Sequence, residues 1–341
     1  MITKKINVSL KPYRGELFFK NGAFKVNTSL NIWFNFKKRL SKFNIDINTI
    51  DLDSKNVNNY IFCDVPYPWE VLLWYKLFFD KAKKILFCFE SPIVDPFSHI
   101  KWIHGFFKRV YTWDDRIIDS KKYFKFFYPQ VKMGLNTKFK KFEDKDFLVL
   151  INSNKMSPWI FKLISPYKTD LYIERIKAIE FFESYDPKIF HLYGYGWNKP
   201  KALSIKEKLL GFKKYRTYRG VIKDKFELLS RFKFSLVFEN CIADGYITDK
   251  IFDCFKAGCV PIYLGDPNIG SYISSNCFID FRRFKNYEEL VEFLNKIDEK
   301  SYNSYINKAQ QFISSNEFLK IWSDDAFEKI LLDSISYSTA S

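Results

Sequence analysis

Several features that mark common protein classes are scarce or missing in this sequence. Its 341 residues include only 12 glycines, 12 prolines and three histidines, and no repeat or low-complexity tract interrupts it. No run of about 18 uncharged apolar residues occurs, and the N-terminus, MITKKINVSLKPYRG, lacks the apolar core of a signal peptide. Apolar residues make up 47% of the chain, which is ample for packed cores. We therefore expect a folded cytoplasmic protein without a signal peptide or transmembrane helix.

Metal-binding patterns are also missing. The six cysteines occur singly, mostly inside predicted strands and helices, which favours reduced, buried thiols. His99 and His104 are five residues apart, which is not the spacing of a helical metal pair. The adjacent Asp114 and Asp115 lie far from the phosphate site predicted below, so we interpret them as part of a turn. The sequence predicts neither a metal nor a required cofactor.

Positive charge is abundant: 55 Lys and Arg against 39 Asp and Glu give a formal net charge of +16. The basic residues are spread along the chain, which usually indicates a solvated surface. The charge also suits a protein that binds a nucleotide-sugar diphosphate and touches an anionic membrane surface, as a peripheral protein on the inner face would. Charge alone permits nucleic acid as a partner, but no recognition-helix, RNP or zinc-finger pattern occurs, so we expect none.

The most informative stretch is Lys233–Pro267, KFSLVFENCIADGYITDKIFDCFKAGCVPIYLGDP. Its two apolar runs, Phe234–Phe238 and Val260–Leu264, are typical of strands buried on both faces of a parallel sheet. Between them, apolar residues recur every three or four positions and predict a helix, with Thr248 as its N-cap and Gly258 at its end. The sequence therefore predicts a strand, loop, helix and strand in succession.

Polar residues gather where the first of these strands ends and the helix begins. They are Glu239, Asn240, Asp244, Tyr246, Asp249 and Lys250. Ligands of open parallel sheets bind at this edge, so we expect the site there. Lys250 lies in the first helical turn, where the helix dipole disfavours a cation by about 0.3–1 kcal/mol. A bound phosphate or diphosphate would reverse that penalty, but compensation of Lys250 by Asp249 and solvent explains the residues equally well.

The rest of the chain alternates between apolar strands and amphipathic helices, which predicts two α/β domains. We expect a Rossmann-like domain over residues 1–145 and a second one, with closing helices, over 146–341. The expected strands are 4–10, 57–63, 85–89, 109–112, 147–151, 189–193, 234–238, 260–264 and 277–281. The expected helices are 29–43, 69–79, 171–185, 223–232, 248–258, 287–295, 301–314 and 317–334.

The central stretch resembles the donor-binding motif of the α-1,3/4-fucosyltransferases, glycosyltransferase family 10. The pattern FENxxxxxYxTxKIxxxxxAGxVPIYLG is matched from Phe238 to Gly265. The family usually has Glu before the lysine, where this chain has Asp249. The likeness is nearly continuous from about Phe147 to Glu289 and limited to short motifs in the first domain. It implies the GT-B fold, with two Rossmann-like domains facing each other across a cleft, the first for the acceptor and the second for the GDP-sugar donor.

The resemblance also assigns roles upstream of the central stretch. The segments INSNK (Ile151–Lys155) and YIERIKAIEFF are similar to the family's Ser-Asn turn and Arg-bearing helix, so it implies that Ser153, Asn154 and Arg175 contact the nucleotide diphosphate. Without the resemblance, Arg175 would be a helix surface residue paired with Glu174 or Glu180.

In the first domain, FCFESP (Phe87–Pro92) is similar to the short family motif that carries the catalytic base, which implies that role for Glu90. Glu90 also ends an expected interior strand, although many strands simply end in a solvated Glu.

The remaining candidates are weaker. Arg216 and Arg219 lie in a basic loop and are alternative phosphate ligands. Tyr246 would contact the nucleotide or pack on the helix as a loop aromatic. Glu239 and Asn240 end a strand that should be buried, and hydrogen bonds to donor hydroxyls would satisfy them.

Together these features predict an inverting α-1,3(/4)-fucosyltransferase. It would transfer L-fucose from GDP-β-L-fucose to a GlcNAc or glucose hydroxyl of an oligosaccharide acceptor, with Glu90 as base and Lys250 and Arg175 stabilising the departing GDP. Two alternatives stay open: a transferase of another GDP-sugar, and a non-catalytic protein that binds glycan or nucleic acid through the same basic surface.

Overall fold

The computed structural model describes residues 5–11, 31–52, 56–130, 139–200 and 212–337. The chain divides into two compact units. Unit 1 comprises Met1–Lys132, Ile164–Pro166 and Lys320–Ser341, and unit 2 comprises Met133–Leu163 and Tyr167–Leu319. This division differs from the expected one in three respects: the break falls before residue 145, the C-terminal segment groups with unit 1, and so does Ile164–Pro166. The second difference arises because Phe327 of the last helix packs against Phe36 and Phe87 of unit 1.

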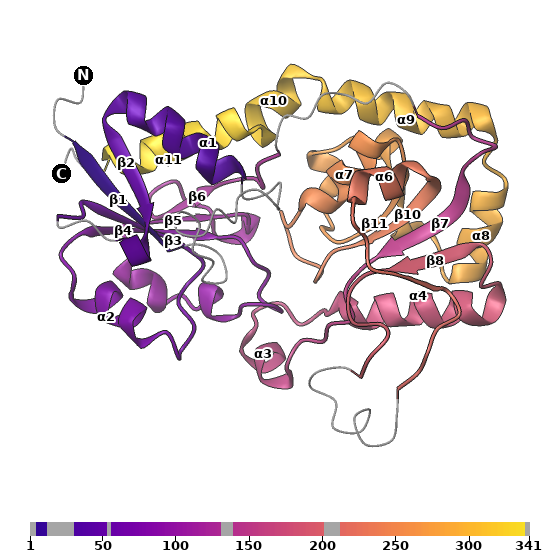
Figure 1. Cartoon of the computed structure of the whole chain (residues 1–341), viewed down its shortest axis with the longest axis horizontal. Helices are drawn as coiled ribbons and strands as arrows, with labels where there is room; N and C mark the ends of the chain where they lie inside the picture. The colour runs from indigo at the N-terminus through magenta and orange to yellow at the C-terminus, as the bar shows by residue number, and fades with distance from the viewer. Residues whose placement is uncertain (1–4, 12–30, 53–55, 131–138, 201–211, 338–341) are drawn as a thin grey trace. The chain divides into compact units, whose positions relative to one another are not determined.

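Unit 1 is built on a six-stranded sheet in which every strand pair is parallel. The strand order is β2-β1-β3-β4-β5-β6. The strands are β1 (Ile6–Lys11), β2 (Ile45–Thr49), β3 (Asn59–Cys63), β4 (Lys83–Cys88), β5 (Arg109–Thr112) and β6 (Tyr123–Lys125). Helices α1 (Asn31–Leu40) and α11 (Asp324–Tyr337) cover one face of this sheet and α2 (Val71–Phe79) covers the other (Figure 1).

Unit 2 contains a second six-stranded parallel sheet, with the order β12-β11-β10-β7-β8-β9. Its strands are β7 (Asp146–Ile151), β8 (Phe190–Tyr193), β9 (Tyr218–Gly220), β10 (Phe232–Phe238), β11 (Val260–Leu264) and β12 (Ile279–Asp280). The chain runs from β7 outward through β8 and β9, then returns to place β10 on the other side of β7. The neighbouring strands β7 and β10 therefore form the topological switch point, where ligands of doubly wound sheets bind at the carboxyl edge.

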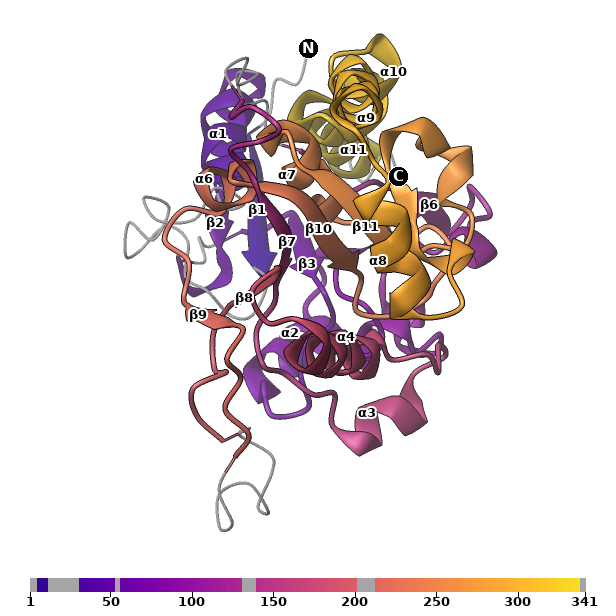
Figure 2. The same cartoon turned by 90° about the vertical axis from the view of Figure 1, so that its right-hand side faces the viewer.

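Helices cover both faces of the second sheet. They are α4 (Leu171–Tyr185), α6 (Lys225–Ser230), α7 (Asp249–Ala257), α8 (Tyr287–Asn295) and α9 (Glu299–Ile313). Two further helices are α3 (Trp159–Ile164) and α10 (Asn316–Trp322), the second of which crosses into unit 1. α4 lies on one side of the sheet and α7 on the other (Figure 2). α7 has the predicted ends: the Thr248 hydroxyl accepts from the Lys250 N–H, and Gly258 adopts the left-handed conformation at φ +65°.

The expected elements agree with the structure except in a few places. The helix expected over 223–232 ends at Ser230, because Phe232 already belongs to β10. The long helix expected over 317–334 is two helices that meet at Ser323. The short edge strands β2, β6 and β9 and helix α3 were not expected, since their segments are too short or too polar for a clear period. No helix among the described residues is long and apolar enough to cross a membrane.

Candidate functional site

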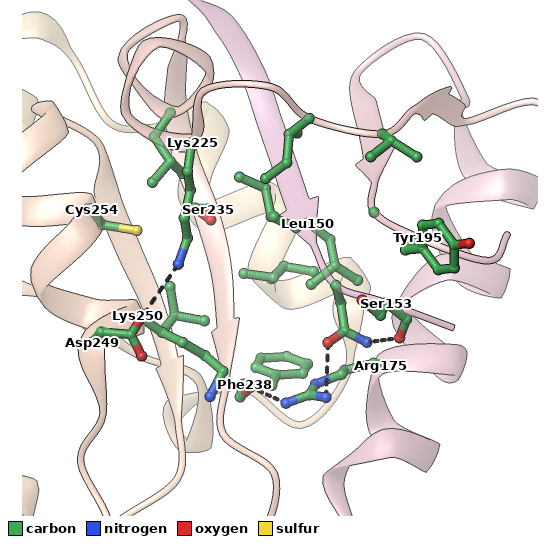
Figure 3. Close-up of a pocket in the computed structure, with 18 residues that line it drawn as sticks. Leu150, Ser153, Arg175, Tyr195, Lys225, Ser235, Phe238, Asp249, Lys250 and Cys254 are labelled. Carbon is green, nitrogen blue, oxygen red and sulfur yellow. Dashed lines mark hydrogen bonds and ion pairs between the residues drawn. The ribbon is translucent and has the colours of Figure 1, made fainter. Parts of the chain in front are cut away.

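A pocket of about 380 Å³ opens at the carboxyl edge of the second sheet, at its switch point. The ends of β7 and β10 form its floor, and Ser153 and Tyr195 from the loops after β7 and β8 form part of its wall. Lys225, Asp249 and Lys250 line the opposite side, across the pocket from Arg175 and Ser153 (Figure 3). The pocket therefore combines an apolar floor with several cationic groups, as a site for an anionic ligand requires.

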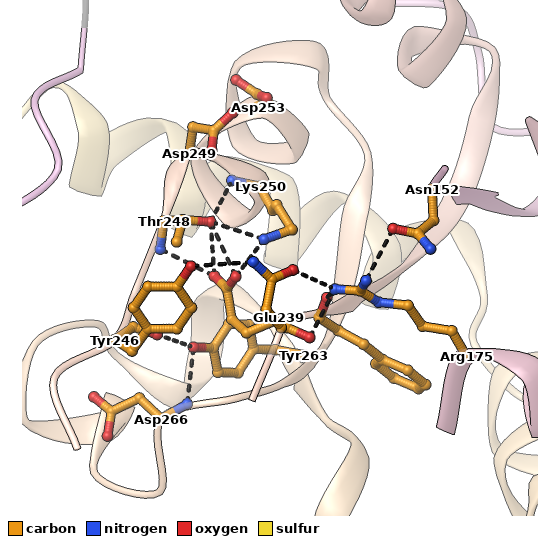
Figure 4. Close-up of polar contacts among 12 residues, drawn as sticks. Asn152, Arg175, Glu239, Tyr246, Thr248, Asp249, Lys250, Asp253, Tyr263 and Asp266 are labelled. Carbon is orange, nitrogen blue, oxygen red and sulfur yellow. Dashed lines mark hydrogen bonds and ion pairs between the residues drawn. The ribbon is translucent and has the colours of Figure 1, made fainter. Parts of the chain in front are cut away.

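Glu239 organises one side of this site. Its carboxylate is fully buried and accepts hydrogen bonds from the Thr248 N–H at 2.9 Å and the Thr248 hydroxyl at 2.9 and 3.0 Å (Figure 4). The Lys250 ammonium donates to the other carboxylate oxygen at 2.5 Å. Glu239 thus fixes the N-cap of α7 and the lysine of its first turn.

The partner of Lys250 is therefore Glu239, and Asp249 pairs instead with Lys225 at 3.6 Å. Asp249 interacts electrostatically with Lys250 but forms no ion pair with it, so the direct compensation of the lysine comes from Glu239 across the loop. The Lys250 side chain keeps 27% of its surface exposed and faces the pocket. The buried carboxylate of Glu239 also has its partners within the protein, so its burial alone gives no reason to expect a contact with donor hydroxyls.

Arg175 is buried in the pocket wall, not exposed on the surface of α4. It donates to the Asn152 side-chain oxygen at 3.0 Å, to the carbonyls of Phe238 and Glu239 at 2.6 and 2.7 Å, and to the Asn240 side-chain oxygen at 3.1 Å. Among the described residues, no carboxylate forms a salt bridge with it, and burial lowers the pKa of Arg175. The nearby Glu239 and Asp170 carboxylates oppose this shift, but the hydrogen-bond acceptors of the guanidinium are uncharged, so an anion in the pocket would stabilise its charge further.

The other predicted donor contacts lie at or near the same edge. Ser153 lines the pocket, and the Asn154 amide donates to the Gly196 carbonyl at 3.1 Å. Asn240 bridges Arg175 and the Tyr246 hydroxyl, to which its amide donates at 3.3 Å. Tyr246 itself is buried behind this layer and does not line the pocket, which agrees with its packing role.

Arg216 and Arg219 are not brought to the pocket. Arg216 binds the carboxylate and the carbonyl of Glu183, at the last turn of α4, and Arg219 donates to the carbonyl of Pro187 at 3.4 Å. Both acceptors precede β8, so they lie at the amino edge of the sheet, opposite the site. The sequence could not rank these arginines because the direction of their side chains depends on the fold of the basic loop.

Lys225 is a pocket residue that the sequence did not single out. Its ammonium forms an ion pair with Asp253 and lies 3.6 Å from Asp249, one turn earlier on α7. Although burial opposes the charge, the two carboxylates raise the pKa of Lys225. Aspartates at positions i and i+4 of a helix are the signal that could have indicated a cation from a neighbouring element.

Gly194 shapes the pocket through its backbone. It follows β8 with φ +139°, and a Cβ there would lie 1.9 Å from the Asn152 carbonyl oxygen. Only glycine allows the ends of β7 and β8 to approach this closely. The same Asn152 carbonyl accepts a hydrogen bond from the Trp197 indole at 2.6 Å.

We expect Gly194→Ala to destabilise unit 2 by more than about 3 kcal/mol, because both the backbone angle and the close approach are incompatible with a Cβ. Gly220→Ala is the matched control: its φ is also positive, at +113°, but nothing lies within 4 Å of the added Cβ. It should cost only about 1–2 kcal/mol. Urea unfolding of both variants measures the difference, and equal losses would contradict the steric argument.

Glu90 lies in unit 1, two residues after β4, and is half-buried. Its N–H donates to the Asp64 carboxylate at 3.1 Å, and its carbonyl contacts the His99 ring at 2.9 Å. Asp64 also accepts from the Phe89 N–H at 2.7 Å. The N–H and the carbonyl of Glu90 are therefore both fixed by hydrogen-bonding partners. These contacts set the position of the backbone from which the Glu90 side chain extends.

Asp64 gives unit 1 a predictable pH dependence. Burial, with the nearby Asp95, raises its pKa to about 7, while Lys11 opposes the shift. A carboxyl whose pKa is raised by folding binds its proton more tightly in the folded state, so stability falls as pH rises from about 4 to about 7. Asp64→Asn keeps the Oδ1 acceptor and suits the left-handed φ of +61°. We expect it to flatten this dependence and to raise the melting temperature by a few degrees at about pH 8. A uniform loss at every pH in thermal unfolding would contradict the assignment.

The described residues contain no group of three or more His, Cys, Asp or Glu that could hold a metal ion. Asp114 caps a short turn by accepting from the Arg116 N–H, so the interpretation of Asp114 and Asp115 as a turn is confirmed. All six cysteines are buried thiols, as the sequence predicts.

Solved structures with a similar fold are glycosyltransferases. A crystal structure of an α1,3-fucosyltransferase matches with a TM-score of 0.57 and 15% identity, over 97% of this chain and 90% of that one. An α-glucosyltransferase in complex with UDP and DNA matches with a TM-score of 0.55 and 13% identity, over 97% of this chain and 99% of that one. With the two parallel sheets, these matches define the GT-B class of glycosyltransferase folds.

The likeness to a family lies mostly in the sequence of unit 2. Residues 206–327 match the family model described as "Glycosyltransferase family 10 (fucosyltransferase) C-term". This part of the chain is therefore similar to the C-terminal domain of glycosyltransferase family 10. The match includes Glu239, Asn240, Tyr246, Asp249 and Lys250, whereas Glu90, Ser153, Asn154 and Arg175 lie outside it.

Curated relatives match over a short stretch. The α-(1,3)-fucosyltransferase FucT of Helicobacter pylori is 35% identical over 94 residues, which are 27% of this chain and 20% of that protein. The GDP-fucose protein O-fucosyltransferase 3 of Bos taurus is 36% identical over 98 residues, 28% of this chain and 20% of that protein. The mouse 4-galactosyl-N-acetylglucosaminide 3-alpha-L-fucosyltransferase 9 is 38% identical over 94 residues, 26% of each. The chain thus matches about a quarter or less of the length of these relatives.

Proposed function

We propose that this protein is an inverting fucosyltransferase that uses GDP-β-L-fucose as donor. The observation that carries the proposal is the buried Arg175 guanidinium in the pocket wall, whose hydrogen-bond acceptors at Phe238 and Glu239 are backbone carbonyls and which faces Lys250 across the pocket. Two cations on opposite sides of one pocket suit a diphosphate that gains charge as it leaves.

The donor is supported by what the relatives share. Enzymes named for a sugar acceptor and for a protein acceptor match this chain about equally well, at 38% and 36% identity, over segments of similar length. Their common feature by name is fucosyl transfer, so the matched segment supports the donor and not the acceptor. A solved α1,3-fucosyltransferase with GDP-fucose has the same fold, at a TM-score of 0.53 and 15% identity.

The proposed reaction is a single displacement. Glu90 takes the proton of the acceptor hydroxyl, and the hydroxyl oxygen bonds to C1 of fucose while the bond from C1 to the phosphate oxygen breaks. Lys250 and Arg175 stabilise the GDP that leaves, and attack from the opposite face converts the β-linked donor into an α-linked product. We propose that the step needs no metal, since the cations take that role, and that the enzyme works in the cytoplasm.

For the acceptor we propose a GlcNAc or glucose hydroxyl of an oligosaccharide, in α-1,3 or α-1,4 linkage. The match to a protein O-fucosyltransferase favours a protein hydroxyl as the second candidate. A screen of GDP-fucose and GDP-mannose against oligosaccharide and peptide acceptors, with linkage analysis of the product and EDTA in parallel, tests donor, acceptor and metal independence together. Transfer from GDP-mannose alone would refute the donor, and salt-sensitive glycan or nucleic-acid binding without affinity for GDP would refute the enzyme.

A further inference from the structure

Helix α2 of unit 1 carries an apolar surface on its solvent side, and none of its residues lines the pocket described above. Only Leu77 of this helix is buried. We call the α2 face the exposed side chains of Leu72, Tyr75, Phe78 and Phe79 with Trp102 and Phe106 from the neighbouring loop. Leu72 is 78% and Phe79 70% exposed, although both are large and apolar.

The α2 face is continuous and not a scatter of single residues. The ring centres of Phe78 and Phe106 lie 4.8 Å apart, those of Tyr75 and Phe79 5.1 Å and those of Trp102 and Phe106 6.4 Å. Phe78 and Phe79, with ring centres 6.3 Å apart, join these pairs into one cluster. Contiguous apolar surface of this kind marks an interaction site more often than chance exposure.

The exposed charged residues described next, at the rim of the α2 face, are positive. Lys81, Lys101 and Lys108 are exposed beside it. The acidic neighbours turn inward: Glu70 accepts from the Tyr67 N–H at 2.6 Å, and Asp80 accepts from the Tyr60 hydroxyl at 2.9 Å. The result is an aromatic and aliphatic surface with a basic rim.

We propose that the α2 face docks on an anionic lipid surface, with its aromatic and aliphatic side chains among the acyl chains and its lysines at the headgroups. Aromatic residues with a rim of lysine are what a helix lying in a membrane interface requires. A symmetric dimer through the same face would bring the rim lysines of two copies together, and aliphatic Leu72 offers no stacking surface to a sugar. This proposal places the protein at a membrane surface, and it does not depend on the proposed transfer reaction.

Flotation of the full chain with phosphatidylcholine vesicles, with and without about 30% phosphatidylglycerol, tests the proposal. We expect binding to the anionic vesicles that weakens at about 0.5 M salt. Leu72→Gln/Phe79→Gln should reduce the bound fraction at least about tenfold, and Lys101→Gln/Lys108→Gln should remove the preference for phosphatidylglycerol. GDP affinity and melting temperature should not change in either variant, which separates this test from that of the reaction.

Trp159→Gln/Leu163→Gln is the matched control, since both residues are similarly exposed, at 72% and 63%, but belong to α3. It should bind vesicles within about twofold of the wild type. Equal loss in both double variants would show that exposed apolar surface in general drives binding and would overturn the proposal. So would failure of the wild type to bind anionic vesicles, or a concentration-dependent dimer in sedimentation velocity that the Leu72→Gln/Phe79→Gln variant abolishes.

Discussion

Replacing Glu90 by Gln is expected to slow fucosyl transfer by about 10²–10⁴-fold while leaving the affinity for GDP unchanged. Gln has nearly the same shape as Glu but cannot accept the proton of the acceptor hydroxyl at neutral pH. The backbone of Glu90 is held by Asp64 and by the contact with His99, neither of which involves its side chain. The substitution therefore removes one carboxylate and keeps these two backbone contacts.

Glu70→Gln is the matched control for this experiment. Glu70 is a half-buried carboxylate of the same unit, and its oxygen accepts from the Tyr67 N–H at 2.6 Å, a role that the amide oxygen of Gln retains. Its transfer rate should stay within about twofold of the wild type. Full activity of the Glu90→Gln variant, with GDP affinity measured by calorimetry in parallel, would remove Glu90 from the mechanism.

The central unit of the fold is predictable from the sequence because its signals are local. The apolar runs of β10 and β11, the Thr248 cap and the Gly258 end each depend on residues within a few positions of one another. The position of the site at the carboxyl edge follows from the same pattern. The order of the strands does not, because the return of the chain from β9 to β10 depends on packing between distant segments.

Contacts between distant segments of the chain also explain which interactions in the site could not be predicted from the sequence. The ion pair of Glu239 and Lys250 joins a strand end to a helix across a loop, and neither periodicity nor spacing indicates it. Arg175 reaches the carbonyls of β10 from a helix more than sixty positions away in the chain. Arg175 shares the buried face of α4 with Leu171, Ala178, Ile179 and Phe182, but an arginine in a helix is ordinarily assigned to the surface, and its acceptors come from distant segments.

Lys250 forms an ion pair with the buried Glu239 carboxylate and, as we propose, binds the diphosphate. Substitutions can distinguish its effect on stability from its effect on GDP binding. Lys250→Met keeps the aliphatic stem but leaves the Glu239 carboxylate buried without its cation. We expect a loss of stability on the order of 3 kcal/mol, seen as a fall in melting temperature of about 5–10 °C. GDP affinity should fall by about 10–100-fold, because a hydrogen bond between charged groups contributes about 1.5–3 kcal/mol.

The double variant Lys250→Met/Glu239→Gln decides between the two roles. Gln at position 239 can still accept from Thr248 but carries no charge to leave unpaired, so most of the lost stability should return. If Lys250 binds the diphosphate, the double variant will be stable and will still bind GDP weakly. If Lys250 serves only Glu239, restoring the fold will restore GDP binding, and the phosphate contact would have to come from Arg175 or Lys225 on the other walls of the same pocket.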